Sequence, residues 1–380
     1  MSEVNPFHQP VHDVRGPAEV AGVADALAGA DLLAVDVEAD ALHAFRPRLC
    51  FVQLGTDRDI WLLDTLETPG LAPLAPLFHD PTLTKVFHAA GGDLQFLAEA
   101  GVRVRGLFDT HRAATLLGWP QVGLADLVSQ SLGTKLTKEH QQADFAQRPL
   151  PAPLHDYIAD DVRYLTELGR RVRSACQAAD ILEEVLLDCE RLADEAAVRP
   201  EVARFEPKIP RSLPAADQAF LAAAGAALHA LRLKWAEAAD VPMGKMLSNA
   251  GLQEILTRAP KDLRALARTP GVRGQVVREH GEEVLELLRR VRAQADRGEL
   301  QPPPPLARDA AKKKREDALK AWRSEAAAAR KVTPSVVLTN PLVEALARER
   351  PHSREELALI PYLGEKRVRL YGDALLRLLR

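Results

Sequence analysis

Residues 32–38 read Leu32-Leu33-Ala34-Val35-Asp36-Val37-Glu38, an apolar segment in which two acidic side chains stand two positions apart. The segment is short and partly β-branched, which favours a β-strand over a helix. Side chains two apart on a strand point to the same face, so Asp36 and Glu38 would share one face of a sheet. Asp188-Cys189-Glu190 has the same spacing but lies in a helical stretch, where residues two apart diverge. We therefore expect only the first pair to act together.

The sequence around this segment alternates strand-like and helix-like stretches. Short apolar segments bounded by turn residues predict strands at 32–37, 50–54, 60–64 and 85–89, whereas 94–100, 112–117 and 154–194 have helical patterns. The first three strands have short connections, which indicates antiparallel pairing, and the later ones alternate with helices. The expected fold is an α/β domain with a mixed sheet and flanking helices.

A third acidic residue, Asp93, follows Gly91-Gly92 at a predicted strand-to-helix junction. An aspartate at such a place is often only an N-cap for the helix. However, the strand at 85–89 would end beside Asp36 and Glu38, at an edge where ligands collect in α/β layers. Both interpretations, helix cap and metal ligand, stay open.

Tyr157 and Asp161 stand four apart in the helical stretch 154–194, so they are neighbours on one helix face. A phenol and a carboxylate could therefore address the same centre as the strand acids. Asp160, three positions from Tyr157, competes with Asp161 for this role. We favour Asp161 and interpret Asp160 as a solvated helix charge.

The composition is typical of a globular protein, and the length indicates two or three domains. The chain has 380 residues, of which 47% are hydrophobic and 27% charged, and no apolar run approaches the 18 residues of a membrane span. Residues 1–16 lack the basic start and apolar run of a signal peptide, so we expect a cytoplasmic protein. The three cysteines are far apart and odd in number, which suggests neither a disulfide framework nor a zinc site.

The second half of the chain contains a repeat. Residues 241–249 (VPMGKMLSN) match residues 332–340 (VTPSVVLTN), and prolines, a glycine and a leucine-rich end recur at the same shift of about 91 positions. Each copy has the amphipathic spacing of a small helical bundle. Prolines near 200–214 mark a boundary before the first copy, and Gln301 followed by four prolines forms a semi-rigid spacer before the second.

These features predict five segments: an N-terminal extension (1–16), an α/β domain (17–205), a first helical module (206–297), a Pro-rich and basic linker (298–312) and a second helical module (313–380).

The net charge of −3 gives no general attraction to a polyanion. A nucleic-acid substrate would therefore need metal ions at the acidic site and local basic patches elsewhere. One candidate patch is Lys312-Lys313-Lys314-Arg315, with further basic residues after it at Lys320, Arg323, Arg330 and Lys331. A solvated linker and helix face explains these residues equally well.

The ordered series Asp36, Glu38, Asp93, Tyr157, Asp161 resembles the DEDDy branch of the DEDD 3′-to-5′ exonucleases, and the whole chain resembles the ribonuclease D family. The similarity extends to residues 47–54, 85–89 and 147–165, which resemble the second strand, second motif and third motif of that family. The repeated module resembles the HRDC domain, of which the family carries two copies.

The resemblance implies a ribonuclease H-like nuclease domain that removes nucleoside 5′-monophosphates from RNA 3′ ends, with tRNA precursors as the expected substrate. It implies two Mg²⁺ or Mn²⁺ ions, one held by Asp36, Glu38 and Asp161 and the other by Asp36 and Asp93. Tyr157 would orient the attacking water, since a phenol with a pKa near 10 is a poor general base at neutral pH. No membrane is implied, and we expect a monomer.

The sequence departs from the family pattern at Val37 and Ala39, where a threonine and an aromatic residue are usual. Neither position would bind metal, so contacts to the terminal nucleotide are the ones in doubt. Phe96 could stack on a base or pack in the core. His88 is a second candidate for substrate contact, although His88 and His155 are each more typical of structural or surface residues.

The sequence leaves two alternative functions open. One is a 3′-to-5′ DNA exonuclease of the same mechanism, because no residue above reads a 2′-hydroxyl. The other is a non-catalytic nucleic-acid-binding scaffold with an inert nuclease-like domain. The presence of all five acidic and phenolic residues argues against the scaffold.

Overall fold

The computed structural model describes residues 7–68, 70–136, 140, 142–198, 204–304 and 309–380. The chain forms two compact units. The first comprises Met1–Ala39, Leu49–Arg199 and Arg308–Arg380, and the second comprises Asp40–Arg48 and Pro200–Ala307. Among the described residues, no helix is both long and apolar enough to cross a membrane.

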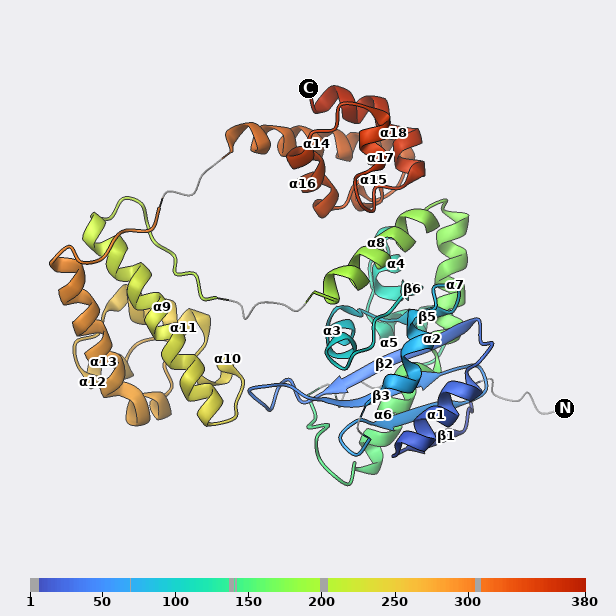
Figure 1. The fold of residues 1–380 in the computed structure, drawn as a ribbon, viewed down its shortest axis with the longest axis horizontal. Coiled ribbons are helices and arrows are strands. Elements are labelled where there is room, and N and C mark those ends of the chain that lie inside the picture. The colour runs from blue at the N-terminus through green and yellow to red at the C-terminus, as the bar shows by residue number, and fades with distance from the viewer. Residues whose placement is uncertain (1–6, 69, 137–139, 141, 199–203, 305–308) are drawn as a thin grey trace. The chain divides into compact units, whose positions relative to one another are not determined.

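A six-stranded mixed sheet lies in the first unit (Figure 1). Its strands, in the spatial order β1-β4-β3-β2-β5-β6, are β1 (Val11–Val14), β4 (Ile60–Asp64), β3 (Leu49–Gly55), β2 (Leu32–Ala39), β5 (Thr84–Phe87) and β6 (Leu107–Asp109). β2, β3 and β4 form an antiparallel meander, and β1, β5 and β6 join it in parallel pairs. The predicted α/β fold with a mixed sheet and an antiparallel beginning is confirmed.

Three details differ from the sequence expectation. Residues 11–14, placed in an N-terminal extension, form strand β1 against β4, so the sheet begins before residue 17. β6 was not predicted, because three residues are too short to show a period. The single helical stretch 154–194 is three helices, namely α6 (Ala152–Arg163), α7 (Leu165–Ala178) and α8 (Leu182–Ala196).

Helices α6 and α7 pack on the sheet that carries the acidic strand. α6 contacts β2, β3 and β4, and α7 contacts β2 and β5. The approach of α7 is close because Gly169 has no side chain: a Cβ there would stand 2.8 Å from Cγ1 of Val86 on β5. The apolar residues between these layers are almost entirely buried, among them Ile158, Leu168 and Val172. This packing fixes α6 over the middle of the sheet.

Shorter helices complete the sheet domain of this unit. They are α1 (Pro17–Ala26), a 3₁₀ turn η1 (Ala72–Leu74), α2 (Ala75–His79), α3 (Gly91–Glu99), α4 (Thr110–Leu117) and α5 (Leu124–Leu132). α3 contacts β2 and α8, which brings the start of α3 to the same strand as the first two acids.

The two helical modules have the same element pattern. The first has α9 (Ala215–Ala238), α10 (Met243–Met246), α11 (Asn249–Arg258), α12 (Leu263–Ala267) and α13 (Gly274–Asp296). The second has α14 (Ala310–Arg330), α15 (Pro334–Val337), α16 (Asn340–Glu349), α17 (Arg354–Ala358) and α18 (Glu365–Leu378). Helices α15 to α18 each begin 91 positions after their counterparts α10 to α13, as the repeat in the sequence predicts.

A hydrogen-bonded arginine repeats with the same shift. Nη1 of Arg232 donates to the carbonyl of Leu247 at 3.0 Å and to Oδ1 of Asn249 at 2.7 Å. Nη1 of Arg323 likewise donates to the carbonyl of Leu338 at 3.0 Å and to Asn340 at 2.9 Å. The repeat therefore preserves an internal hydrogen-bond network as well as an apolar pattern.

The proline spacer is contacted from the first module. Both terminal nitrogens of Arg211 donate to backbone carbonyls, Nη1 to Pro303 and Nη2 to Pro304, each at 3.0 Å. The rest of the expected linker, 305–308, lies outside the described residues, and α14 begins at Ala310.

The second module contacts α8 within the first unit. Glu184 of α8 is fully buried and accepts from Nη1 of Arg330 at 2.8 Å and from Nζ of Lys366 at 3.1 Å. Thr333 also donates to the carbonyl of Leu116 at 3.0 Å. Arg330, a member of the basic patch, therefore has a structural role here.

Candidate functional site

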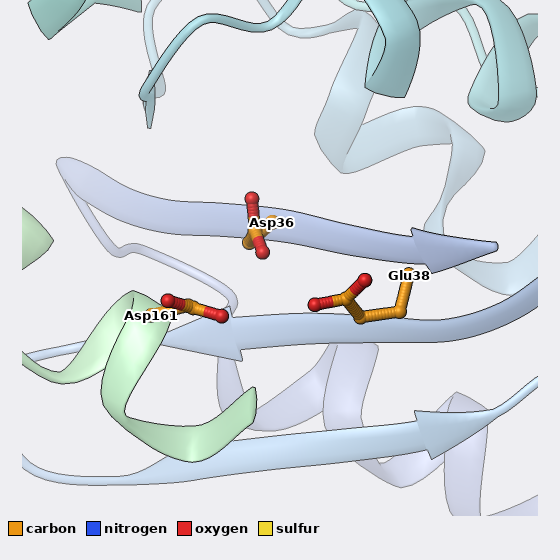
Figure 2. Close-up of side chains that lie close together, drawn as sticks. All are labelled: Asp36, Glu38 and Asp161. Atoms are coloured by element: carbon orange, nitrogen blue, oxygen red, sulfur yellow. The ribbon is translucent and has the colours of Figure 1, made fainter. Parts of the chain in front are cut away.

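Three of the predicted acids converge in the folded chain. Asp36, Glu38 and Asp161 each offer a carboxylate oxygen, and these oxygens all lie within 4.8 Å of one another. Figure 2 shows the first two side chains on β2 and the third on the helix beside it, α6. Residues 125 positions apart in sequence are thus brought to the surface of a single strand.

The strand register explains how β2 presents its acids. Asp36 pairs with Gln53 and Glu38 with Phe51 across the antiparallel β2–β3 ladder. The register shifts between Glu38 and Ala39, where the ladder has an irregularity. Such bulges re-aim side chains and are frequent beside active sites.

Asp93 approaches the same centre from α3. It is not one of the three acids grouped within 4.8 Å, but its negative charge contributes to raising the pKa of both Asp36 and Glu38. The N-cap of α3 is Ala90, with no side-chain hydrogen bond, and Asp93 is the third residue of the helix. The alternative that Asp93 serves as the N-cap is therefore wrong.

The turn that carries Asp93 is held by a residue that the sequence did not single out, Asp109 at the end of β6. Its two carboxylate oxygens accept from the backbone N–H groups of Ala89 and Ala90, each at 3.0 Å. The same carboxylate accepts from the N–H groups of His111 and Arg112 and so caps α4. Ala89 has φ of 60°, a left-handed conformation that these bonds stabilise. An aspartate directly before a helix is a cap signal that could have identified it.

The carboxylates are crowded enough that their pKa values rise. Burial is the largest cause in each case, followed by repulsion from neighbouring acids. The pKa of Glu38 rises to about 9, and those of Asp93 and Asp161 rise to about 7. Burial and the charges of Asp93, Asp161 and Glu38 raise the pKa of Asp36 well above its usual value. The four acidic residues still retain some contact with solvent.

This donor set fits a divalent cation. All of the converging ligands are carboxylate oxygens, which are the hard donors that magnesium and manganese prefer. Burial, followed by mutual repulsion, raises their pKa values, and a bound cation would favour the charged form of each carboxylate against both effects. Hydrolysis of a phosphodiester also requires positive charge near the phosphate, which these acidic side chains do not provide.

Tyr157 lies on the same helix face as Asp161. Its hydroxyl hydrogen-bonds to Asp161, and burial together with the charge of Asp161 raises the pKa of the phenol above its ordinary value. Its ring stacks on Phe145 at 6.4 Å between centroids and meets the edge of His140 at 5.7 Å. The phenol is thus held in place by its ring and remains protonated at neutral pH.

Asp160, His155 and His88 each have a different hydrogen-bond partner. Asp160 accepts from Nε of Arg163 at 2.7 Å, as a helix charge one turn from its partner. Nε2 of His155 lies 2.8 Å from Oδ1 of Asp13, and Nδ1 of His88 lies 2.9 Å from Oγ1 of Thr110. Burial lowers the pKa of His88 to about 4, so it is neutral.

Phe96, the candidate for base stacking, is half-buried in α3 and packs against the core of the sheet domain. Its remaining exposed surface keeps a substrate contact open as a prediction.

Several charges of the basic patch are engaged within the second module. Nζ of Lys312 lies 3.2 Å from Glu344, Nζ of Lys313 lies 3.4 Å from Asp317, and Nε of Arg315 donates to the carbonyl of Ala347 at 2.8 Å. Exposed ion pairs of this kind are weak, so they could give way to phosphate. An RNA-binding role for Lys312, Lys313, Lys314 and Arg315 stays a prediction.

Arg148, within the segment that resembles the third motif, organises the wall of the site. It donates to both carboxylate oxygens of Asp64, at 2.6 and 2.7 Å, and its guanidinium lies 4.4 Å from the centroid of the Phe51 ring. Phe51 is opposite Glu38 in the sheet, so Arg148 fastens the segment that includes Phe145 to the strands beneath the acids. No sequence signal pairs Arg148 with Asp64, because the two are 84 positions apart.

Sequence families match nearly the whole chain. Residues 11–191 match the 3′-5′ exonuclease family, and residues 222–288 and 312–379 each match the HRDC domain. Ribonuclease D of Gluconacetobacter diazotrophicus is 34% identical over 283 residues, which cover 73% of this chain and 71% of that protein. Ribonuclease D of Acidiphilium cryptum is 31% identical over 365 residues, which cover 94% and 90%.

Solved structures share the fold. The crystal structure of Escherichia coli RNase D, described as an exoribonuclease involved in structured RNA processing, superposes with a TM-score of 0.68 at 23% identity and covers 97% of this chain and 98% of that one. The catalytic core of RRP6 from Trypanosoma brucei gives 0.62 at 22% identity, over 77% and 82%.

Proposed function

The chain belongs to the ribonuclease D family and is a hydrolytic 3′-to-5′ exoribonuclease, and on this premise we propose that Asp36, Glu38, Asp93 and Asp161 hold two divalent cations, Mg²⁺ or Mn²⁺, that drive the hydrolysis. The observation that carries the proposal is the convergence of three carboxylate oxygens within 4.8 Å, with pKa values raised by burial and mutual repulsion.

The acids divide between the two cations by position. Asp36 would bind both cations, Glu38 and Asp161 would complete one site, and Asp93 would complete the other from α3. When bound, the cation pair supplies the charge that lowers the pKa of the attacking water and stabilises the departing 3′ oxygen. The protein's own part is to hold the acids at fixed positions on β2, α3 and α6.

Tyr157 orients the attacking water and is not its base. Its hydroxyl hydrogen-bonds to Asp161, and its pKa is raised further from neutrality by burial. A protonated phenol can accept a hydrogen bond from water while it donates to the carboxylate. Its ring contacts with Phe145 and His140 keep the hydroxyl from rotating away.

The substrate proposed is the 3′ tail of a structured RNA such as a tRNA precursor, released one nucleoside 5′-monophosphate at a time. The two HRDC domains and the similarity to a protein described as acting in structured RNA processing favour this class. Phe96 and His88 are proposed to contact the terminal nucleotide. Val37 and Ala39, the positions that depart from the family pattern, would affect the same contacts.

We further propose a cytoplasmic monomer with domain limits near those expected from sequence, the nuclease domain then beginning at β1 (Val11–Val14). The three cysteines are all buried and none of them is in a disulfide, which suits a reducing compartment.

The test uses a 5′-labelled tRNA with a short single-stranded 3′ extension, incubated with EDTA-treated protein with and without Mg²⁺ or Mn²⁺. We expect stepwise shortening and nucleoside 5′-monophosphates only when a cation is added. The same extension ending in a 3′-phosphate serves as a control for attack from a free 3′ end.

A matched single-stranded DNA in the same assay separates the two nuclease hypotheses. Faster degradation of DNA than of RNA would favour the DNA exonuclease, and cleavage in EDTA would remove the cation mechanism.

A further inference from the structure

Gln53 stands out as a polar side chain with no evident structural purpose. It is the only polar residue of β3, whose sequence is Leu-Cys-Phe-Val-Gln-Leu-Gly, and it is fully buried. Neither Oε1 nor Nε2 has a hydrogen-bond partner among the described residues. A buried amide without a partner costs on the order of 1–3 kcal/mol, so an apolar side chain would serve the fold better.

The register places Gln53 beside the acids. It is the cross-strand partner of Asp36, and paired residues of an antiparallel ladder point to the same face about 4.5–5.5 Å apart. That face looks toward α6: at Gly55, two residues along, a Cβ would stand 3.2 Å from Cβ of Val162. The amide therefore lies in the layer between the sheet and the helix that carries Asp161.

An amide suits this position better than other donors. Asp36 accepts a hydrogen bond from the backbone N–H of Val37 and is otherwise surrounded by acids. A lysine or arginine beside it would compete with a bound cation for the carboxylate charge. A neutral N–H orients the carboxylate and leaves that charge to the cation, as outer hydrogen-bond partners of metal ligands do.

We propose that Gln53 is a positioning residue, whose Nε2–H donates to the carboxylate of Asp36 and holds it in the orientation that binds the cations. The inference rests on the proposed metal role of Asp36. The fold tolerates a buried, unpartnered amide because the hydrogen bond forms in the cation-bound enzyme.

The test replaces Gln53 by methionine, which has nearly the same length and no N–H. Three quantities are measured on the full chain: the melting temperature in EDTA, its rise on adding Mn²⁺, and the Mn²⁺ concentration for half-maximal cleavage of a labelled single-stranded RNA. We expect an unchanged or higher melting temperature in EDTA, a smaller rise with Mn²⁺, and a Mn²⁺ requirement increased about tenfold or more.

Two comparison variants make the result specific. Thr339→Val removes another buried oxygen without a partner, in the second helical module, and should leave the Mn²⁺ requirement unchanged. Asp36→Asn reports on the metal site itself. If Asp36→Asn loses its response to Mn²⁺ while Gln53→Met responds as the wild type does, the role of Gln53 is refuted and the metal site stands.

If Asp36→Asn keeps its activity and its response, the proposed metal site is refuted. A lower melting temperature of Gln53→Met in EDTA with an unchanged Mn²⁺ requirement would make Gln53 a packing residue and overturn the inference. Gln53→Leu, which also lacks an N–H but has another shape, must show the same loss of Mn²⁺ response as Gln53→Met.

Discussion

At the scale of single residues, the buried acids destabilise the folded protein when no metal is bound. Burial and repulsion raise the pKa of Glu38 to about 9 and those of Asp93 and Asp161 to about 7. A carboxyl group with a raised pKa binds its proton more tightly in the folded than in the unfolded chain. Such a carboxyl group therefore stabilises the fold fully at pH values below its pKa in the unfolded chain, which is near 4. This stabilisation is lost as the pH rises through its pKa in the folded chain.

The first prediction follows from this sign. In EDTA, the melting temperature should fall between pH 5 and pH 8, because each proton held only by the folded state is worth about 1.4 kcal/mol per pH unit. The pKa of Glu38 is about 9 in the folded chain, so at pH 8 folding requires this carboxyl group to take up a proton. Glu38→Gln removes that requirement, so its melting temperature should exceed that of the wild type at pH 8 and differ less at pH 5. Differential scanning calorimetry measures both curves. A variant that melts below the wild type at pH 8 would show that the pKa of Glu38 is not raised in the folded chain.

Tyr157→Phe removes the hydroxyl and keeps the ring contacts with Phe145 and His140. We expect kcat to fall about 10- to 100-fold, because a misplaced water loses the attack geometry, while KM changes little. The shape of the pH profile should stay the same, since the raised pKa of the phenol excludes it as the base. Steady-state rates between pH 6 and 9 provide the measurement. Disappearance of an alkaline limb in the variant would mean that Tyr157 does carry the proton.

The sequence predicted part of this site. Strand and helix periods are enough to pair Asp36 with Glu38 and Tyr157 with Asp161, because those spacings are local. Asp109 and Gln53 were not predicted, because their roles depend on partners 17 to 20 positions away, on neighbouring strands and turns. A polar residue in an otherwise apolar strand was the one local signal for Gln53.

At the scale of elements, the site depends on how closely helices approach the sheet. α7 meets β5 at Gly169, where a Cβ would stand 2.8 and 2.9 Å from the two γ-carbons of Val86. Since α6 leads directly into α7, a displacement of α7 would also move the helix that presents Asp161.

Gly169→Ala should therefore lower the free energy of unfolding by about 1–3 kcal/mol, as expected for overpacking. Gly22→Ala is the matched control: Gly22 is exposed in helix α1, and a Cβ there meets nothing within 4 Å. The control should stabilise the protein by about 0.5–1 kcal/mol, because alanine favours the helix. Urea unfolding of both variants is the measurement, and equal shifts in the two would refute the close approach.

The strands that were predicted correctly are those with a clear apolar pattern. The apolar strands β2 to β5 have clear patterns, whereas β1 alternates Val-His-Asp-Val over four residues and β6 has only three. Short edge strands gain their stability from neighbours that are distant in sequence, β4 for β1 and β5 for β6, so local patterns do not reveal them.

At the scale of the whole molecule, the two HRDC domains share one internal network but differ in their surroundings. In the second, Arg330 and Lys366 neutralise the buried Glu184 of α8, and Val336 joins the core of the sheet domain. Deleting residues 301–380 would therefore unpair a buried carboxylate as well as remove a binding surface. Surface charge variants test RNA binding more cleanly than this deletion.

Lys314→Glu combined with Lys320→Glu alters two exposed charges of α14 that lie outside the buried network. If this helix contacts RNA, the variant should bind a 3′-extended tRNA more weakly and with a shallower salt dependence, because fewer phosphate contacts release fewer counterions. Cleavage of a short oligonucleotide that reaches only the nuclease domain should be unaffected. Fluorescence anisotropy at several salt concentrations measures the slope, and an unchanged slope would leave the patch as a solvated helix face.

Asp36 would bind both proposed cations, so the most direct test of the cation mechanism is single-turnover cleavage of a labelled 3′-extended RNA by Asp36→Asn, with RNA affinity measured in parallel. Asp160→Asn, which alters the neighbouring helix charge paired with Arg163, is the control and should cleave as the wild type does. We predict that Asp36→Asn lowers the cleavage rate at least about 100-fold at saturating Mg²⁺ or Mn²⁺ and retains RNA binding. Cleavage by Asp36→Asn at the rate of the wild type would contradict the account.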